Sequence, residues 1–257
     1  MNVTVFYTVI FQFLITVSSA IACDPPAYLL FHEDAKNRFD SLNIQPADST
    51  LFDRVILSHN LAFNDYSQQR KVSEKLLKNF VDRFGWTNQA TAFSGSLKML
   101  RVRDRSIAGI IGRKIVTGFG LFGDDPKKEA KKGFELIRSS INQDTSNVRL
   151  RILGLTAAVE VAEYIDELLP YAFKDLKWLE SRLNQLDSAE VFFYRLSWAK
   201  YSYKYTLKHR QSSEAVKGLA WLSHAEKYAC RPVYQREVEL WRDKIDNLID
   251  ELKAETE

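Results

Sequence analysis

Apolar residues recur from residue 27 onward at intervals of three and four positions, the spacing that places them on one face of an α-helix. Strand-like alternation of apolar and polar residues is rare. The pattern predicts helices of about 15 to 20 residues with short links, a rhythm typical of antiparallel helix pairs. The predicted helices cover roughly residues 51–62, 67–84, 87–102, 126–142 and 146–155, one or two within 165–186, and then 188–207, 212–230 and 232–252.

Residues at the ends of these segments support the predicted boundaries. Asp124-Asp125-Pro126 is a typical helix start, because aspartate accepts backbone amides and proline suits the first helical position. Gly85 follows the segment 67–84, where glycine can end a helix in the left-handed conformation. Pro170 marks either a boundary or a kink.

The composition fits this helical pattern. The chain is 46% hydrophobic and 27% charged, with only 10 glycines and 6 prolines in 257 residues. So few helix breakers almost exclude an all-β fold. The formal net charge of +3 is spread along the chain, so we expect no nucleic-acid partner. The sequence predicts an all-α fold, with antiparallel helix pairs stacked as a degenerate tetratricopeptide-like solenoid or as a compact helical array.

The tetratricopeptide consensus does not recur at a fixed period, so any repeats are degenerate. The segments Ala92–Leu97, Arg101–Asp104, Asn147–Arg151 and Lys174–Leu176 nevertheless resemble a family of uncharacterised bacterial helical proteins with tetratricopeptide-like repeats. The resemblance covers roughly residues 87–186. It implies a repeat scaffold without a known activity.

The amino terminus has the features of an export signal. No charged side chain precedes Asp24, and Val3 to Val17 is a mostly apolar run. Ala20-Ile21-Ala22 offers the small residues that signal peptidase requires, so we predict that residues 1–22 are a signal peptide cleaved after Ala22. An uncleaved membrane anchor is the alternative, because the run is about long enough to span a bilayer.

Cleavage would leave Cys23 as the first residue of the mature chain. Bacterial lipoproteins begin with such a cysteine, which suggests lipidation and membrane attachment. In an oxidising compartment Cys23 could instead pair with Cys230, or Cys230 could be a small buried apolar residue. We expect an exported protein in the periplasm, or attached to the membrane and facing the periplasm; secretion is the alternative. We expect residues 23–45 to form a tether and residues 46–257 a single helical domain.

A glycine-rich apolar insertion is predicted at residues 105–124. It contains Gly118-Phe119-Gly120-Leu121-Phe122-Gly123, which matches the GxGxxG pattern of dinucleotide-binding folds. No βαβ pattern surrounds this match, and Asp124-Asp125 would repel a phosphate, so we expect no cofactor. We interpret Phe119, Leu121 and Phe122 as part of a mobile flap over a groove, membrane or partner. A loop or distorted helix packed on the core is the alternative.

An aromatic stripe is predicted on the helix at 188–207. Tyr194, Trp198, Tyr201 and Tyr205 follow one another at intervals of three and four residues, so they share a helix face. Such a stripe could grip a peptide, because tyrosine and tryptophan combine a large contact area with a polar tip. The alternative is that it packs in the core.

No pattern of catalytic or metal-binding residues is present. The four histidines share no metal-ligand spacing, and we expect them to be solvated or incidental. There is no GxSxG motif, and neither cysteine has a recognisable nucleophile setting. We expect a non-enzymatic, exported helical scaffold that binds a protein or peptide. The alternative is a periplasmic accessory protein that binds an apolar small ligand in a helical pore or cleft lined by Trp198, Tyr201 and the flap.

Overall fold

The computed structural model describes residues 25–63, 67–113, 126–162 and 165–255 of the chain. Within these ranges there are ten α-helices and four short 3₁₀ turns, and no strand, which confirms the all-α helical array. The α-helices are α2 (His32–Ile44), α3 (Leu51–Phe63), α4 (Ser67–Phe84), α5 (Asn88–Arg113), α6 (Pro126–Gln143), α7 (Val148–Val161), α8 (Leu169–Glu180), α9 (Ser188–His209), α10 (Ser212–Glu226) and α11 (Pro232–Ala254). The 3₁₀ turns are Ala27–Leu29, Asp48–Thr50, Asp166–Leu168 and Leu183–Gln185.

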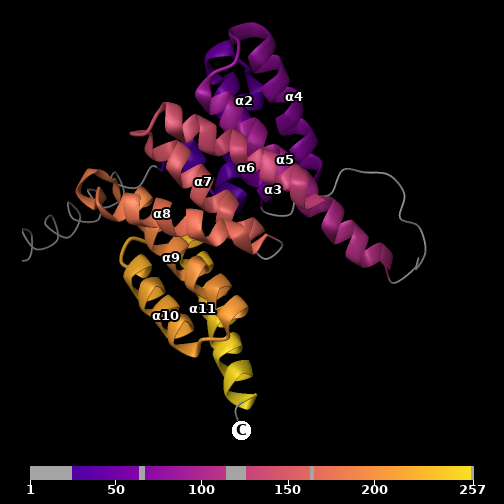
Figure 1. Ribbon diagram of the computed structural model, residues 1–257. Helices are drawn as coiled ribbons and strands as arrows, with labels where there is room; N and C mark the ends of the chain where they lie inside the picture. The colour runs from indigo at the N-terminus through magenta and orange to yellow at the C-terminus, as the bar shows by residue number, and fades with distance from the viewer. Residues whose placement is uncertain (1–24, 64–66, 114–125, 163–164, 256–257) are drawn as a thin grey trace, which may run out of the picture.

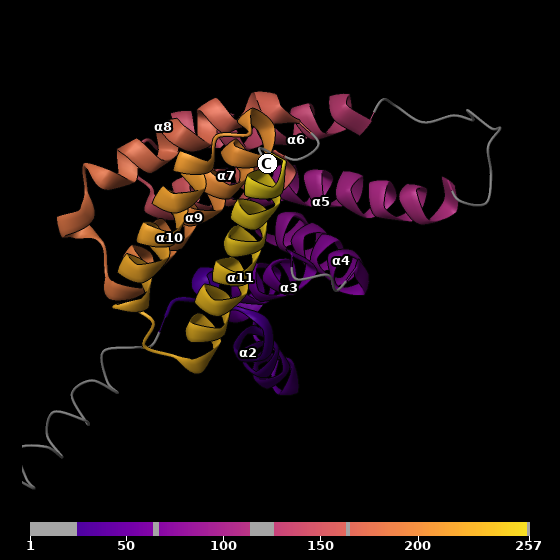
Figure 2. The same ribbon diagram turned by 90° about the horizontal axis from the view of Figure 1, so that it is seen from below.

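The helices form an array that follows the order of the chain. In Figure 1, α2 and α4 lie at one end, α3 and α5 to α8 in the middle, and α9 to α11 at the other end. Helices that are neighbours in sequence pack most extensively, above all α5 with α6, α9 with α10 and α3 with α4. Figure 2, seen from below, shows α5 and α6 side by side and α11 alongside the array.

The closest helix contact occurs where α5 crosses α6. Gly95 on α5 faces Gly133 on α6, and a Cβ atom placed on either residue would overlap the carbonyl oxygen of the other. The two backbones therefore touch without side chains between them. Only glycine permits this approach.

The segment expected to be a tether is part of the folded core instead. Leu29 and Ala35 are fully buried, and α2 occupies most of residues 32–45. The Tyr234 hydroxyl on α11 donates a hydrogen bond of 3.1 Å to the Leu29 carbonyl. Arg231 pairs with Asp34 at 2.8 Å. The tether expectation did not foresee this docking, because Leu29 and Ala35 are buried through contacts with α3 and α11, which are distant in sequence.

Helix α5 is longer than its pattern predicted. It continues past residue 102 to Arg113, through the first half of the predicted insertion. The segment 114–125 lies outside the described residues, and with it the predicted flap residues and the GxGxxG match. Residues 1–24, which contain the predicted signal and Cys23, also lie outside them. Among the helices of the described ranges, none is both long enough and apolar enough to cross a membrane.

Candidate functional site

A cavity of about 370 Å³ lies where both ends of the chain meet the middle of the array. Helices α3, α5, α7, α9 and α11 contribute to its wall, together with the segment before α2. Its volume is in the range of small-molecule binding sites. The lining residues are Tyr28, Leu30, Phe31, His59, Asn60, Phe63, Phe93, Arg103, Arg149, Ile152, Leu153, Thr156, Val159, Glu160, Phe193, Leu196, Ser197, Lys200, Lys204, Glu237, Leu240, Trp241 and Lys244.

The lining has two distinguishable ends. At the first end, the Arg149 guanidinium lies 4.8 Å from the centre of the Tyr28 ring, and the Tyr28 hydroxyl donates a hydrogen bond to Glu190 on α9. At the second end, Glu160 pairs with Lys200 of α9 at 3.3 Å. Arg149 and Glu160 lie about three turns apart on α7, which is roughly 16 Å. The wall formed by α7 and α9 is therefore elongated.

The wall between the two ends is mainly apolar. Leu153 and Leu196 are buried side chains of α7 and α9 that face the cavity. Phe31 and Phe193 stack on each other with their ring centres 5.0 Å apart. Such a surface gives water few hydrogen-bond partners, so it favours an apolar occupant.

His59 is a buried polar group in this wall. Its side chain is 2% exposed, and its Nε2 lies 2.8 Å from the Ser96 hydroxyl oxygen. Its Nδ1 has no hydrogen-bond partner within the described ranges. Burial lowers the pKa of His59 to about 3, so the ring is neutral at physiological pH. His59 is therefore buried and not solvated, because α3 is buried on more than one face.

The second end of the cavity is rich in lysine. Lys200 lies 4.9 Å and Lys244 lies 4.4 Å from the centre of the Trp241 ring. Burial alone would raise the pKa of Glu160, but the charges of Lys200 and Lys204 outweigh it and hold that pKa below its usual range. Glu160 is therefore ionised at neutral pH.

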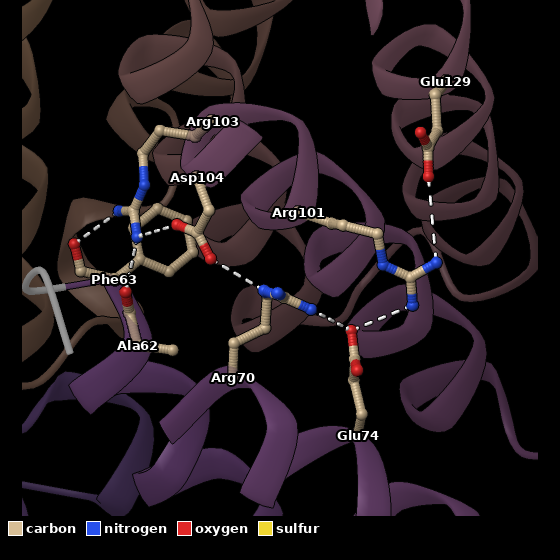
Figure 3. Close-up of polar contacts among 8 residues, drawn as sticks. All are labelled: Ala62, Phe63, Arg70, Glu74, Arg101, Arg103, Asp104 and Glu129. Carbon is tan, nitrogen blue, oxygen red and sulfur yellow. Dashed lines mark hydrogen bonds and ion pairs between the residues drawn. The ribbon is translucent and has the colours of Figure 1, made fainter. Parts of the chain in front are cut away.

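A polar network fixes Arg103 in the wall (Figure 3). Arg103 donates hydrogen bonds of 2.7 Å to the carbonyls of Ala62 and Phe63, which end helix α3, and it pairs with Asp104 at 3.1 Å. Asp104 also accepts a hydrogen bond of 2.7 Å from Arg70 on α4. These bonds tie the end of α3 to α4 and α5. The network continues with alternating charge through Glu74, Arg101 and Glu129.

The predicted aromatic stripe is directed away from this cavity. Tyr194 is fully buried, and Trp198 and Tyr201 are each only 8% exposed. Trp198 stacks on Trp221 of α10 with ring centres 5.2 Å apart. The burial agrees with the packing interpretation, because Tyr194 offers no surface to a partner in this state. Trp198 and Tyr201 do not line the cavity, contrary to the expected ligand cleft. The fourth member, Tyr205, is half-buried.

Cys230 lies close to the start of the described chain. Its neighbour Arg231 pairs with Asp34, and Tyr234 binds the Leu29 carbonyl. The described residues that follow Cys23 in sequence are therefore docked beside those that flank Cys230. Cys23 itself lies outside the described residues, so its lipidation or pairing stays a prediction.

Comparisons with known proteins give no relatives from which a role could be transferred. No family model, no curated protein and no solved structure matches the chain. In the part of the chain that the structure describes, no three histidine, cysteine or acidic side chains cluster as a metal site would require. The cavity and its lining therefore carry the functional argument.

Proposed function

We propose that the protein binds a small, largely apolar molecule in the cavity between α7, α9 and α11. The single observation that carries the proposal is that a space of about 370 Å³ is bordered mostly by aliphatic and aromatic side chains from five helices. A hollow of similar volume beside Trp86 lacks this feature, because its lining comes from α4, α5 and the link between them. A space of this size at the junction of distant segments is typical of a ligand site.

The water in such a space supports the same proposal. At about 30 Å³ per molecule, the cavity has room for roughly a dozen waters. Side chains such as Ile152, Leu153 and Leu196 cannot hydrogen-bond to them. An apolar ligand that displaces these waters gains free energy from the surface that it covers.

The test uses a substitution that fills the cavity. Thr156 faces the cavity from α7 and is only half-buried, so Thr156→Trp adds bulk there. We expect this variant to lose most binding of the neutral fluorescent probe N-phenyl-1-naphthylamine. Asn247→Trp on the exposed face of α11 is the matched control and should bind as the wild type does. Equal probe affinity in both variants, with helical content unchanged, would contradict the proposal.

Native mass spectrometry gives a second readout. Protein purified without added ligand should retain a small molecule, and the Thr156→Trp variant should retain less of it. Protein that is free of any bound mass and also fails to bind the probe would argue against a ligand-binding role.

The protein-binding scaffold stays a prediction, with different residues from those first expected. Tyr194, Trp198 and Tyr201 of the stripe supply little free surface, whereas Phe84 at the end of α4 is 51% exposed and Trp86 in the following link is 63% exposed. A partner would have to use exposed side chains such as these. In that case Trp86→Ser would weaken partner binding without a change in thermal stability.

We also propose that the protein is exported and that Cys23 pairs with Cys230. The apolar amino terminus supports export. The docking of residues 27–34 against α11 favours a disulfide over a lipid tether, because the described chain is already packed against α11 within a few residues of its start. The intact mass measured without reductant tests this. We expect residues 23–257 with two hydrogens fewer than the reduced chain, and added acyl groups would favour lipidation instead.

A further inference from the structure

Positive charge gathers at the second end of the cavity. Lys200 and Lys204 lie one turn apart on α9, and Lys244 approaches from α11 beside the Trp241 ring. Glu160 is the carboxylate that faces them from α7. Arg103 also lines the cavity, but Asp104 compensates its charge. In the rest of the described lining, four cationic side chains stand against two carboxylates. The cations are Arg149, Lys200, Lys204 and Lys244, and the carboxylates are Glu160 and Glu237.

Part of this positive charge is poorly hydrated. The Lys200 side chain is only 16% exposed, and its ion pair with Glu160 is 3.3 Å long. Lys244 has no ion pair within the described residues and rests on the Trp241 ring. Charges removed from water are stabilised by opposite charges and hydrogen bonds. An anionic group on a ligand would supply both to these ammonium groups.

The cavity opens to solvent near the same end. Leu240 is 45% exposed although it lines the cavity, and Lys244 on the next turn of α11 is also exposed. A ligand entering there would bring its apolar body in first. Its charged group would then stay near the mouth, where the lysines and water both solvate it. The arrangement suits a molecule with one charged end.

We infer that the ligand is a single-chain amphiphile, with its apolar body along α7 and α9 and an anionic head group bound by Lys200, Lys204 and Lys244. This inference rests on the proposed function. A carboxylate and a phosphate monoester share the required chemistry, because each presents negatively charged oxygens to lysine ammonium groups. The two head groups therefore become separate arms of the test.

The first experiment compares ligands with the same ten-carbon chain. Decanoate, decyl phosphate, decan-1-ol and decyltrimethylammonium are each used below their aggregation concentration to displace N-phenyl-1-naphthylamine. We expect at least one anion to bind about tenfold more tightly than decan-1-ol, and the cation to bind most weakly. The better of the two anions identifies the head group. Added salt should reduce the advantage of the anion.

The second experiment removes the lysines. The variant Lys200→Gln/Lys204→Gln/Lys244→Gln should lose the preference, so that the anion and decan-1-ol bind with similar affinities. Its matched control, Lys36→Gln/Lys75→Gln/Lys227→Gln, removes the same charge from exposed positions outside the cavity and should keep the preference. If the triple variant does not fold, Lys204→Gln alone should still reduce the preference.

The outcomes separate this inference from the proposed function. If decan-1-ol displaces the probe as well as the anions do, the anionic head group is wrong and the apolar site stands. If the control variant loses the preference as much as the cavity variant, the effect is one of net charge and the inference is overturned. If no ligand binds and the probe does not bind, the proposed function itself fails.

Discussion

The two faces of α9 both carry aromatic rings, but one face is packed against other helices and the other borders the cavity. One face carries Tyr194, Trp198 and Tyr201, which are packed against α8 and α10 with little exposed surface. The other face carries Phe193 and Lys200, which line the cavity. The first face meets aromatic rings of matching size, such as Trp221. The second face meets α7 and α11 across a gap that these side chains do not fill.

The difference shows what decides whether an aromatic helix face becomes core or site. Hydrophobic spacing alone does not distinguish the two faces, because the cavity face also carries the apolar residues Phe193 and Leu196 beside its polar ones. The outcome depends on the residues supplied by the neighbouring helices. Lys200 and Lys204, at the end of the second face, are charged groups that require polar partners. This requirement distinguishes the second face from the packed one.

The largest expected effect comes from the packed face. Trp198→Ala should lower the free energy of unfolding by about 3 to 5 kcal/mol, because it removes a stacked ring from a filled core. Phe193→Ala removes a ring that already borders the cavity, so its cost should be clearly smaller. Urea denaturation of both variants measures this difference. Equal costs, or a larger cost for Phe193→Ala, would contradict the contrast between the two faces.

An intermediate effect should appear on acidification, through His59 across the cavity from α9. The folded pKa of about 3 lies below the ordinary value of 6.5. As the pH falls below 6.5, the unfolded chain binds this proton before the folded protein does. The histidine's contribution to stability should therefore fall as the pH decreases from about 6.5 toward the folded pKa.

The contribution of His59 is isolated by comparing how steeply the free energy of unfolding changes with pH, between pH 7 and pH 4, in variants and wild type. The variant His59→Gln should lose less stability over this range than the wild type. His224→Gln, at an exposed position of α10, should keep the wild-type slope. Parallel slopes for all three proteins would show that His59 does not titrate as its burial implies.

The smallest expected effect concerns Lys200 on the cavity face. Lys200→Gln should cost about 1 kcal/mol at neutral pH, because the ion pair with Glu160 is only partly buried. The lowered pKa of Glu160 means that this stabilisation is present above the ordinary glutamate range. It is lost as the pH falls through the folded pKa. The difference in free energy of unfolding between Lys200→Gln and the wild type should therefore become smaller in acid.

A matched control for this pair is the exposed Lys217, which pairs with Glu214 on α10. Lys217→Gln should change stability very little at any pH in the range. If the stability difference between Lys200→Gln and the wild type instead increased as the pH falls, Lys200 would not stabilise the ionised form of Glu160.

Local signals predicted most of the helical array. The segment 67–84 is α4 with the predicted bounds, and Gly85 follows it with a φ of 77°, as expected for a left-handed cap. Asp124-Asp125-Pro126 likewise predicted the start of α6 at Pro126. These predictions succeeded because caps and periodicity depend on neighbours within one or two turns.

The cavity could not be predicted in the same way, because its wall joins residues from Tyr28 to Lys244. No local pattern reports which helices will face one another across the array. One local signal was available: Lys200 and Lys204 follow Leu196 at one-turn intervals, which places charge on a largely buried helix face. In the sequence alone, however, these lysines cannot be distinguished from lysines on a solvent-exposed helix face.

The contact between Leu29 and Tyr234 joins residues 205 positions apart and sets the order in which the wall can be completed. At a synthesis rate of about 5 to 20 residues per second, the amino-terminal segment waits roughly 10 to 40 s for α11 to be made. During this interval the future cavity is open along its whole α11 side. A ligand present while the chain is being made can therefore be enclosed as the last helix docks, without passing through the mouth between Leu240 and Lys244.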